Sequence, residues 1–292
     1  MLLLRWLCRD CPSSLFLMSP QPRKQFGQHW LRSEKALQQI VKAANLTPDD
    51  RVLEIGPGQG VLTRQLLEQA GAVVAIEIDR DLCKLLAPKL GERENFLLLQ
   101  GDFLAIDLDA LLMDFSQFQQ PNKVVANIPY NITGPILEKL LGTITQPNPR
   151  PYDAIVLLVQ LEVANRLCAK AGSRNFGALT VRVQALANCE LVTLVSAKSF
   201  YPPPKVDSAV VRLVPRLIDP APIDPQWLDR LVRLGFATKR KMLRNNLQSV
   251  IDRDRLSQVL AELEVNPQAR AEDLSVANWV ALSNRLDAET TD

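Results

Sequence analysis

The sequence predicts an α/β protein with a smaller all-helical C-terminal domain, and three observations support this fold class. Short apolar runs have the length and composition of buried strands, and amphipathic segments lie between them. This alternation indicates βαβ units, a parallel sheet with helices on both faces, and right-handed crossovers. The Pro-rich sequence LIDPAPIDP, which begins at Leu217, indicates a linker, and only helical patterns follow it. We therefore expect one domain over residues 21–216 and a second over residues 217–292.

Strands and helices alternate along the first domain. Residues 33–45 have helical spacing with Ser33 placed to cap the helix, and residues 61–71 predict a helix closed by Gly71. We expect further strands at 51–56, 72–79, 96–102, 123–129 and early in 154–169, and further helices at 81–90, around 134–142 and late in 154–169. Little sequence separates the last two predicted strands, 191–200 and 208–216, so these should pair antiparallel at an edge.

The C-terminal domain combines helical patterns with a segregated charge. Helices are predicted over residues 225–237, 239–249, 254–264 and 275–286. From Lys198 to Arg244 there are 10 Lys and Arg residues against 4 Asp and Glu, and from Asn245 to Asp292 there are 4 against 9. A basic surface of this kind favours contact with a polyanion, although charge alone fits a solvated surface equally well.

Composition excludes several classes of protein. The chain has 292 residues, 47% of them apolar and 23% charged, which is typical of a soluble globular protein. No apolar run approaches the ~20 residues of a membrane-spanning helix. The single histidine, His29, excludes a multi-histidine metal centre, and five scattered cysteines fit a reducing cytoplasm. Residues 1–20 show no signal-peptide cleavage site, and we predict that they form a disordered extension.

The first strand-to-helix turn, EIGPGQG, predicts a ligand site. A glycine-rich turn lets the backbone approach a ligand, and the next helix offers free N–H groups. Dinucleotide enzymes use G-x-G-x-x-G, whereas Gly56, Gly58 and Gly60 give G-x-G-x-G. Glu54, just before them, suits a cationic ligand such as S-adenosylmethionine better than a pyrophosphate. The glycine pattern alone also fits an ordinary tight turn.

Polar residues end the next strands. Glu77 and Asp79 follow the glycines by about 20 residues, where an acid can bond ribose hydroxyls, and Asp102 ends the following strand. Each acid alone fits a helix cap or a solvated turn. Because the carboxyl ends of parallel strands meet at one edge of the sheet, together they predict an adenosyl pocket.

The fourth strand ends in Asn-Ile-Pro-Tyr, which suits chemistry on a base amino group. Such a nitrogen is a poor nucleophile because its lone pair is delocalised into the ring. The Asn127 side-chain oxygen and the Ile128 carbonyl, restricted by Pro129, can accept the two N–H bonds and free the lone pair. Tyr130 offers a ring on which a flipped base can stack.

These motifs resemble the ribosomal RNA adenine dimethyltransferase family, in particular the type that acts on small-subunit RNA. The similarity covers RKQFGQHWL, VLEIGPGQG, AIEID, GDFL, NIPYNI and FYPPPKVDSAVVRL, and extends to the last helices. It implies a Rossmann-like S-adenosylmethionine-dependent methyltransferase domain and a helical RNA-binding domain. The implied activity is dimethylation of the N6 amino groups of two adjacent adenosines in the 3′-terminal hairpin loop of small-subunit (16S) rRNA.

The resemblance also implies roles for individual residues. Phe200, the aromatic of SFYPPP, would sandwich the adenine with Tyr130, although Phe200 could equally be a core residue. The family usually has Asn where His29 stands. The implied cofactor contacts are His29, Leu31, Gly56, Glu77, Asp102 and Asn127; the implied catalytic residues are Asn127, Ile128, Pro129, Tyr130 and Phe200; and the implied RNA contacts are Lys239, Arg240, Lys241 and Arg244.

We therefore expect a cytoplasmic, monomeric enzyme that needs no metal and no membrane and acts in ribosome maturation on small-subunit rRNA or a pre-ribosomal small subunit. Three alternatives remain open. One is a large-subunit RNA methylase of the resistance type. Another is a non-catalytic assembly or transcription factor on the same fold. The third, a dinucleotide oxidoreductase, is disfavoured by the glycine spacing.

Overall fold

The computed structural model describes residues 21–23 and 26–287, and the predicted extension at 1–20 lies outside the described residues. The chain forms two compact units, and each contains segments that are distant in the sequence. The first unit contains the described residues up to Ile136, together with Tyr152–Leu161 and Val192–Arg212. The second contains Leu137–Pro151, Glu162–Leu191 and the described residues from Leu213 onward. The chain therefore passes between the two units several times, whereas the Pro-rich linker predicted a single boundary.

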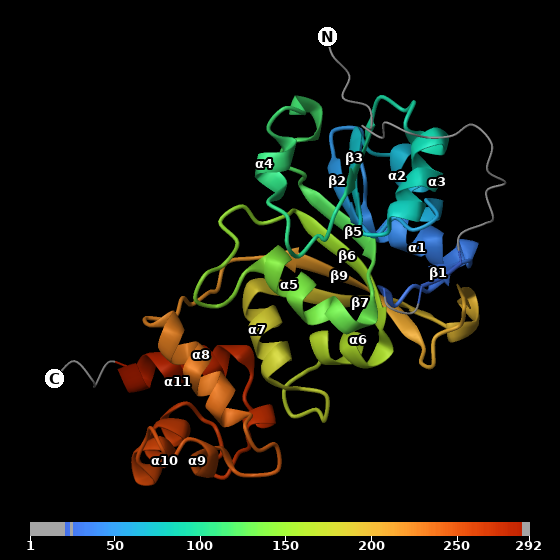
Figure 1. Ribbon diagram of the computed structural model, residues 1–292. Helices are drawn as coiled ribbons and strands as arrows, with labels where there is room; N and C mark the ends of the chain where they lie inside the picture. Colours follow the sequence, from blue (N-terminus) through green and yellow to red (C-terminus); the bar gives the residue numbers. More distant parts are fainter. Residues whose placement is uncertain (1–20, 24–25, 288–292) are drawn as a thin grey trace. The chain divides into compact units, whose positions relative to one another are not determined.

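A seven-stranded sheet forms the centre of the fold, with strand order β4-β3-β2-β5-β6-β9-β7 (Figure 1). Four of its neighbouring pairs, β3 with β4, β2 with β3, β2 with β5, and β5 with β6, are parallel. The order reverses at β2, so the strands ending at the glycine turn and at Asn127 are neighbours, which is where such sheets bind ligands. The strands are β2 (Arg51–Ile55), β3 (Ala72–Glu77), β4 (Phe96–Gln100), β5 (Lys123–Asn127), β6 (Ala154–Gln160), β7 (Ala187–Val195) and β9 (Ser208–Pro215).

The helices of the first unit form where their apolar spacing can face the strands. In α1 (Glu34–Ala44), the Ser33 side chain accepts the Ala36 N–H at 3.3 Å, and the buried residues recur at helical intervals. The helix α2 (Val61–Leu67) ends four residues before Gly71, so its predicted closure there is wrong. Gly71 instead lies where a Cβ would come within 2.0 Å of the Pro48 carbonyl oxygen. The other helices here are α3 (Arg80–Leu90) and α4 (Leu108–Leu112).

The second unit has its own hydrophobic core. Trp279 is fully buried, and its ring centroid lies 5.6 Å from that of Phe236. The Phe236 centroid in turn lies 6.4 Å from that of Phe176. Its helices are α7 (Ala178–Leu186), α8 (Pro225–Gly235), α9 (Leu243–Asn246), α10 (Arg253–Glu262) and α11 (Val276–Asp287), while α5 (Thr133–Leu141) and α6 (Leu161–Leu167) have residues in both units.

The helix predicted over residues 239–249 is wrong for most of that range. Only Leu243–Asn246 is helical, and residues 239–241 form a turn between α8 and α9. Hydrogen bonds to other segments replace the helical ones: the Leu243 N–H donates to the Ala269 carbonyl at 2.9 Å, and the Asn246 side-chain amide donates to the carbonyls of Gly235 and Thr238. Tertiary contacts here override local helical propensity.

A separate two-stranded antiparallel sheet joins β1 (Trp30–Leu31) to β8 (Phe200–Tyr201). Its register pairs Trp30 with Tyr201 and Leu31 with Phe200. Successive side chains along a strand point to opposite faces, so each pair occupies one face. Leu31 and Phe200 belong to the core of the first unit, which leaves Trp30 and Tyr201 on the other face.

Candidate active site

An open cavity of about 1070 Å³ lies at the carboxyl ends of β2, β3, β4 and β5. The glycine turn, the ends of these strands and the segment before β1 line it. The structure brings together all of the predicted cofactor and catalytic residues except Phe200, because the lining includes His29, Leu31, Gly56, Glu77, Asp102, Asn127, Ile128, Pro129 and Tyr130.

Glu54 is the most unusual group in this cavity. Its side chain is 1% exposed, and its Oε2 atom has no hydrogen-bond partner among the described residues. Burial raises the pKa of Glu54 to about 8, and the nearby Glu77 carboxylate adds to this effect. A buried acid with an unpartnered oxygen is costly for the fold, so its position favours a role in binding a cation.

The glycine turn uses its N–H groups internally. The Gly56 N–H donates to the Ile76 carbonyl at 2.9 Å, and the Gly60 N–H donates to the Pro57 carbonyl at 2.9 Å. The Gly58 N–H donates to Glu77 Oε2 at 3.1 Å. Since these donors are already satisfied and Glu54 lies beside them, the turn is poorly suited to a pyrophosphate.

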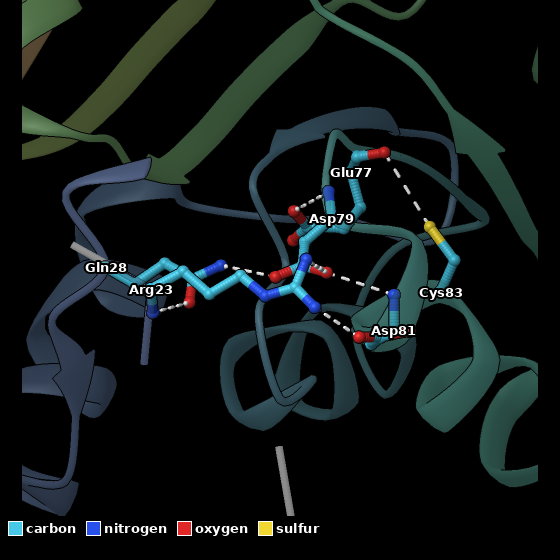
Figure 2. Close-up of polar contacts among 6 residues, drawn as sticks. All are labelled: Arg23, Gln28, Glu77, Asp79, Asp81 and Cys83. Atoms are coloured by element: carbon cyan, nitrogen blue, oxygen red, sulfur yellow. Dashed lines mark hydrogen bonds and ion pairs between the residues drawn. The ribbon is translucent and has the colours of Figure 1, made fainter. Parts of the chain in front are cut away.

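A polar network fixes the segment before β1 to the end of β3 (Figure 2). Arg23 pairs with Asp79 at 3.2 Å and also contacts Asp81, while Gln28 Nε2 donates to Asp79 Oδ2 at 3.1 Å. The Asp79 N–H in turn donates to Glu77 Oε1 at 2.9 Å. With both of its oxygens held by backbone N–H groups, Glu77 is buried in a fixed orientation. Burial raises the pKa of Glu77 above its ordinary value.

Asp102 is a solvent-exposed residue of the lining. It follows the end of β4 and accepts the Leu104 N–H at 2.9 Å through Oδ1. Because the turn holds Oδ1, the second carboxylate oxygen of Asp102 can accept a hydrogen bond from a polar group of a ligand.

S-adenosylmethionine fits these residues. It carries a sulfonium and an ammonium, which match the partnerless oxygen of Glu54, and it has ribose hydroxyls for Glu77 and no phosphate. Trp30 Nε1, another buried polar atom without a partner in the described chain, also belongs to a lining residue and is a donor for an anionic group. When bound, this cofactor supplies an electrophilic methyl group.

The Asn127 side chain is oriented by the backbone of His29. Its Nδ2 donates to the His29 carbonyl at 3.2 Å, so its Oδ1 remains an available acceptor beside the cavity. The His29 ring stacks on Tyr130, with centroids 5.7 Å apart and planes 19° apart, and His29 Nδ1 hydrogen-bonds the Pro202 carbonyl at 2.7 Å. His29 therefore supports the side chains of both Asn127 and Tyr130.

Ser208 holds the other end of Tyr130. The two hydroxyl oxygens are 2.6 Å apart, and Ser208 is fully buried at the start of β9. Burial raises the pKa of Tyr130 above its ordinary value, so this hydroxyl stays neutral near neutral pH. Sequence analysis noted PKVDS as a family motif but missed this role, because nothing in the pattern shows that its serine reaches NIPY.

The structure does not bring Phe200 to the cavity. Phe200 is 3% exposed, lies in the core of the first unit and is absent from the cavity lining. In the β1–β8 sheet Phe200 pairs with Leu31, and both side chains pack in this core. Its position opposite Tyr130 stays a prediction, and the aromatic side chains that line the cavity include Phe26, Trp30, Phe103 and Tyr130.

The predicted RNA contacts lie in the second unit. Lys239, Arg240 and Lys241 are exposed in the turn after α8, and Arg244 is half-buried in α9. Lys239 Nζ donates to the carbonyl of Arg174 at 2.6 Å, which brings a further exposed cation, missed by sequence analysis, to the same place.

Two other findings concern only residues 21–23 and 26–287. No group of three or more His, Cys, Asp or Glu side chains there is arranged to hold a metal ion. No helix in that range is long and apolar enough to cross a membrane.

The fold and the cavity define a Rossmann-like methyltransferase of the S-adenosylmethionine-dependent class. The sequence description of the family "Ribosomal RNA adenine dimethylase" matches residues 20–288. The chain belongs to this family.

Curated relatives and solved structures agree with this assignment. The "Ribosomal RNA small subunit methyltransferase A" of Trichormus variabilis is 67% identical over 269 residues, covering 92% of this chain and 99% of the relative. The protein of that name in Synechocystis is 55% identical over 277 residues, covering 92% and 98%. A Plasmodium falciparum dimethyladenosine transferase matches with a TM-score of 0.74 and 28% identity, covering 90% and 98%. The 23S rRNA methyltransferase ErmE matches with a TM-score of 0.71 and 31% identity, covering 88% and 99%.

Proposed function

We propose that this protein transfers methyl groups from S-adenosylmethionine to the N6 amino groups of two adjacent adenosines in the 3′-terminal hairpin loop of small-subunit rRNA. The observation that carries the proposal is the cavity itself, in which Glu54 and the Asn127 amide lie at neighbouring strand ends, and Glu54 Oε2 has no partner among the described residues. Its relatives with 55–67% identity are named for the small subunit.

The residues of the site would act mainly by positioning. Asn127 Oδ1 and the Ile128 carbonyl accept the two N–H bonds of the adenine amino group, which favours a pyramidal nitrogen with a free lone pair. Pro129, with φ −61°, restricts the backbone that presents that carbonyl. Tyr130 supplies the stacking face, steadied by Ser208 and His29. No strong general base is needed, because the methylated ammonium loses its proton readily.

The target base must leave its stack to reach this cavity. That step costs a few kcal/mol, and less in a loop, while stacking on an aromatic ring returns about 1–3 kcal/mol. Stacking on Tyr130 can therefore offset much of the cost when the substrate is an unpaired loop. This balance favours a hairpin loop over a duplex as the substrate.

Methyl transfer from labelled S-adenosylmethionine to unmethylated small ribosomal subunits tests the proposal. We expect label on small-subunit rRNA, mapped by primer extension to two adjacent adenosines near the 3′ end. Transfer to large-subunit RNA instead would support the activity named for ErmE. No transfer to either RNA would contradict the enzymatic assignment and leave a non-catalytic assembly role. Sedimentation of the purified enzyme tests the proposed monomer, and cell fractionation tests the cytoplasmic location.

We further propose that residues 217–292 grip the RNA through the basic turn after α8. Lys239, Arg240 and Lys241 are exposed and close in sequence to Arg244. Replacing all four with Gln should weaken binding with little regard to sequence, and should flatten the slope of log affinity against log salt by about 0.7–0.9 per lost phosphate contact. A matched variant that neutralises the exposed Lys84 and Lys89 should keep the wild-type slope. An unchanged slope in the quadruple variant would identify a solvated surface.

A further inference from the structure

Tyr201 is a large aromatic residue that the fold leaves exposed. It pairs with Trp30 across the β1–β8 sheet, on the face opposite to Leu31 and Phe200. Its exposure is 41%, against 3% for its neighbour Phe200. The Tyr201 hydroxyl has no hydrogen-bond partner within the described chain. Neither core packing nor a hydrogen bond therefore explains why an aromatic residue stands here.

A guanidinium group lies over the Tyr201 ring. The Arg32 Cζ atom is 4.2 Å from the ring centroid, which is the geometry of a cation–π contact. The Trp30 ring lies 6.5 Å away and is tilted by 35°, so it borders Tyr201 without stacking on it. Arg32 is itself exposed. An exposed tyrosine with an arginine on its ring is a common surface for stacking nucleic-acid bases.

This aromatic pair borders the candidate active site. Trp30 lines the cavity that also contains Asn127 and Tyr130. The residue after Tyr201, Pro202, accepts a hydrogen bond from His29, and the His29 ring stacks on Tyr130. One continuous series of contacts thus connects Tyr201 with the wall on which the target base is proposed to stack.

We propose that Tyr201 and Arg32 form a second stacking platform, which binds an unpaired base of the substrate RNA beside the target adenosine. This inference rests on the proposed function. The platform stacks the base face and does not read base edges, so it tolerates any base while Arg32 adds attraction to the RNA. Holding the neighbouring base keeps the loop open while the target base enters the cavity.

Two substitutions test the platform. Tyr201→Leu keeps an apolar side chain but removes the ring, and Tyr201→Phe keeps the ring and removes only the unpaired hydroxyl. With unmethylated small ribosomal subunits as the substrate, Tyr201→Leu should raise the KM for the subunits about 5- to 150-fold, the range that corresponds to loss of one stacked base. Tyr201→Phe should stay within about twofold of the wild type, since the stacking ring remains.

The controls separate this role from a structural one. The Kd for S-adenosylmethionine and the Tm should be unchanged in both variants, and Leu194→Ala, which trims another exposed apolar side chain, should leave the KM unchanged. A wild-type KM in Tyr201→Leu would overturn the platform while the proposed function stands. A fall in Tm or cofactor affinity that accounts for the KM change would also overturn it, by showing that Tyr201 only supports the small sheet. No transfer by the wild type would overturn the proposed function, and the platform with it.

Discussion

At the amino end of β2, Asp50 accepts hydrogen bonds from Lys123 Nζ at 2.9 Å, from Asn122 Nδ2 at 2.8 Å and from the Thr47 N–H at 2.6 Å. Near the carboxyl end of the same strand, Glu54 is more deeply buried than Asp50, yet its Oε2 has no partner among the described residues. One sheet thus holds two buried carboxylates with opposite surroundings.

The pKa values follow the same difference. Burial alone would raise the pKa of Asp50, but the hydrogen bonds from Asn122, Lys123 and Thr47 outweigh it and lower the pKa. Burial raises the pKa of Glu54 to about 8, because the nearby Thr63 hydroxyl offsets only part of this effect and the Glu77 carboxylate adds to it. Satisfied buried groups stabilise the fold, and unsatisfied ones indicate a ligand site. The amino end should therefore respond to mutation in stability, and the carboxyl end in binding and turnover.

Breaking the pair at the amino end should give the largest effect. Lys123→Met leaves the Asp50 carboxylate buried without its cation, and loss of one partner of a buried pair costs about 3–5 kcal/mol. Urea unfolding measures the change. Arg285→Met, which removes a 3.5 Å pair whose arginine side chain is 60% exposed, should cost no more than about 1 kcal/mol. Similar costs for both variants would show that the Asp50 network contributes little.

Two asparagines at opposite ends of β5, Asn122 just before it and Asn127 as its last residue, sharpen the comparison. Asn127→Ala removes the acceptor for the target amino group and should lower kcat about 10²–10³-fold, while cofactor binding persists. Asn122→Ala, at the other end of the strand, should lower the free energy of unfolding and spare kcat, because its partners are Asp50, Arg51 and Asp153. Turnover of Asn127→Ala within twofold of the wild type would contradict the proposed chemistry.

Sequence patterns predicted the parallel strands well, because each buried strand is a continuous apolar run that ends at a polar or glycine residue. Their carboxyl ends share one edge, so the predicted acids and Asn127 could be placed together before any coordinates were known. The β1–β8 sheet was not predicted, since two-residue strands carry no periodicity. For the same reason the pairing of Phe200 with Leu31 could not be predicted.

Other parts of the site depend on contacts between distant segments. Ser208 reaches Tyr130 across 78 positions, and Gln28 reaches Asp79 across 51, so no local pattern contains either contact. The helix predicted over residues 239–249 was wrong for a related reason, because the Leu243 N–H donates to the carbonyl of Ala269, which is distant in the sequence. Local spacing thus predicted most strands and helices, whereas the hydrogen bonds between distant segments could be identified only from the structure.

The last prediction concerns the proton on Glu54. Its pKa in the folded protein, about 8, lies above its ordinary value of 4.5, so between these values the folded state holds a proton that the unfolded state has lost. The free energy of unfolding of the cofactor-free protein should therefore fall as the pH rises through this window. A cationic cofactor needs the ionised carboxylate, so its binding should release a proton, and its affinity should rise up to about tenfold per pH unit below pH 8. Calorimetry in buffers of different ionisation enthalpy measures the released proton. Glu54→Gln should bind more weakly near pH 8 and lose both the proton release and the pH dependence, whereas Glu68→Gln, at an exposed position, should keep them. If Glu54→Gln bound the cofactor with the wild-type pH dependence, the partnerless carboxylate would be a cost to the fold without a role in binding.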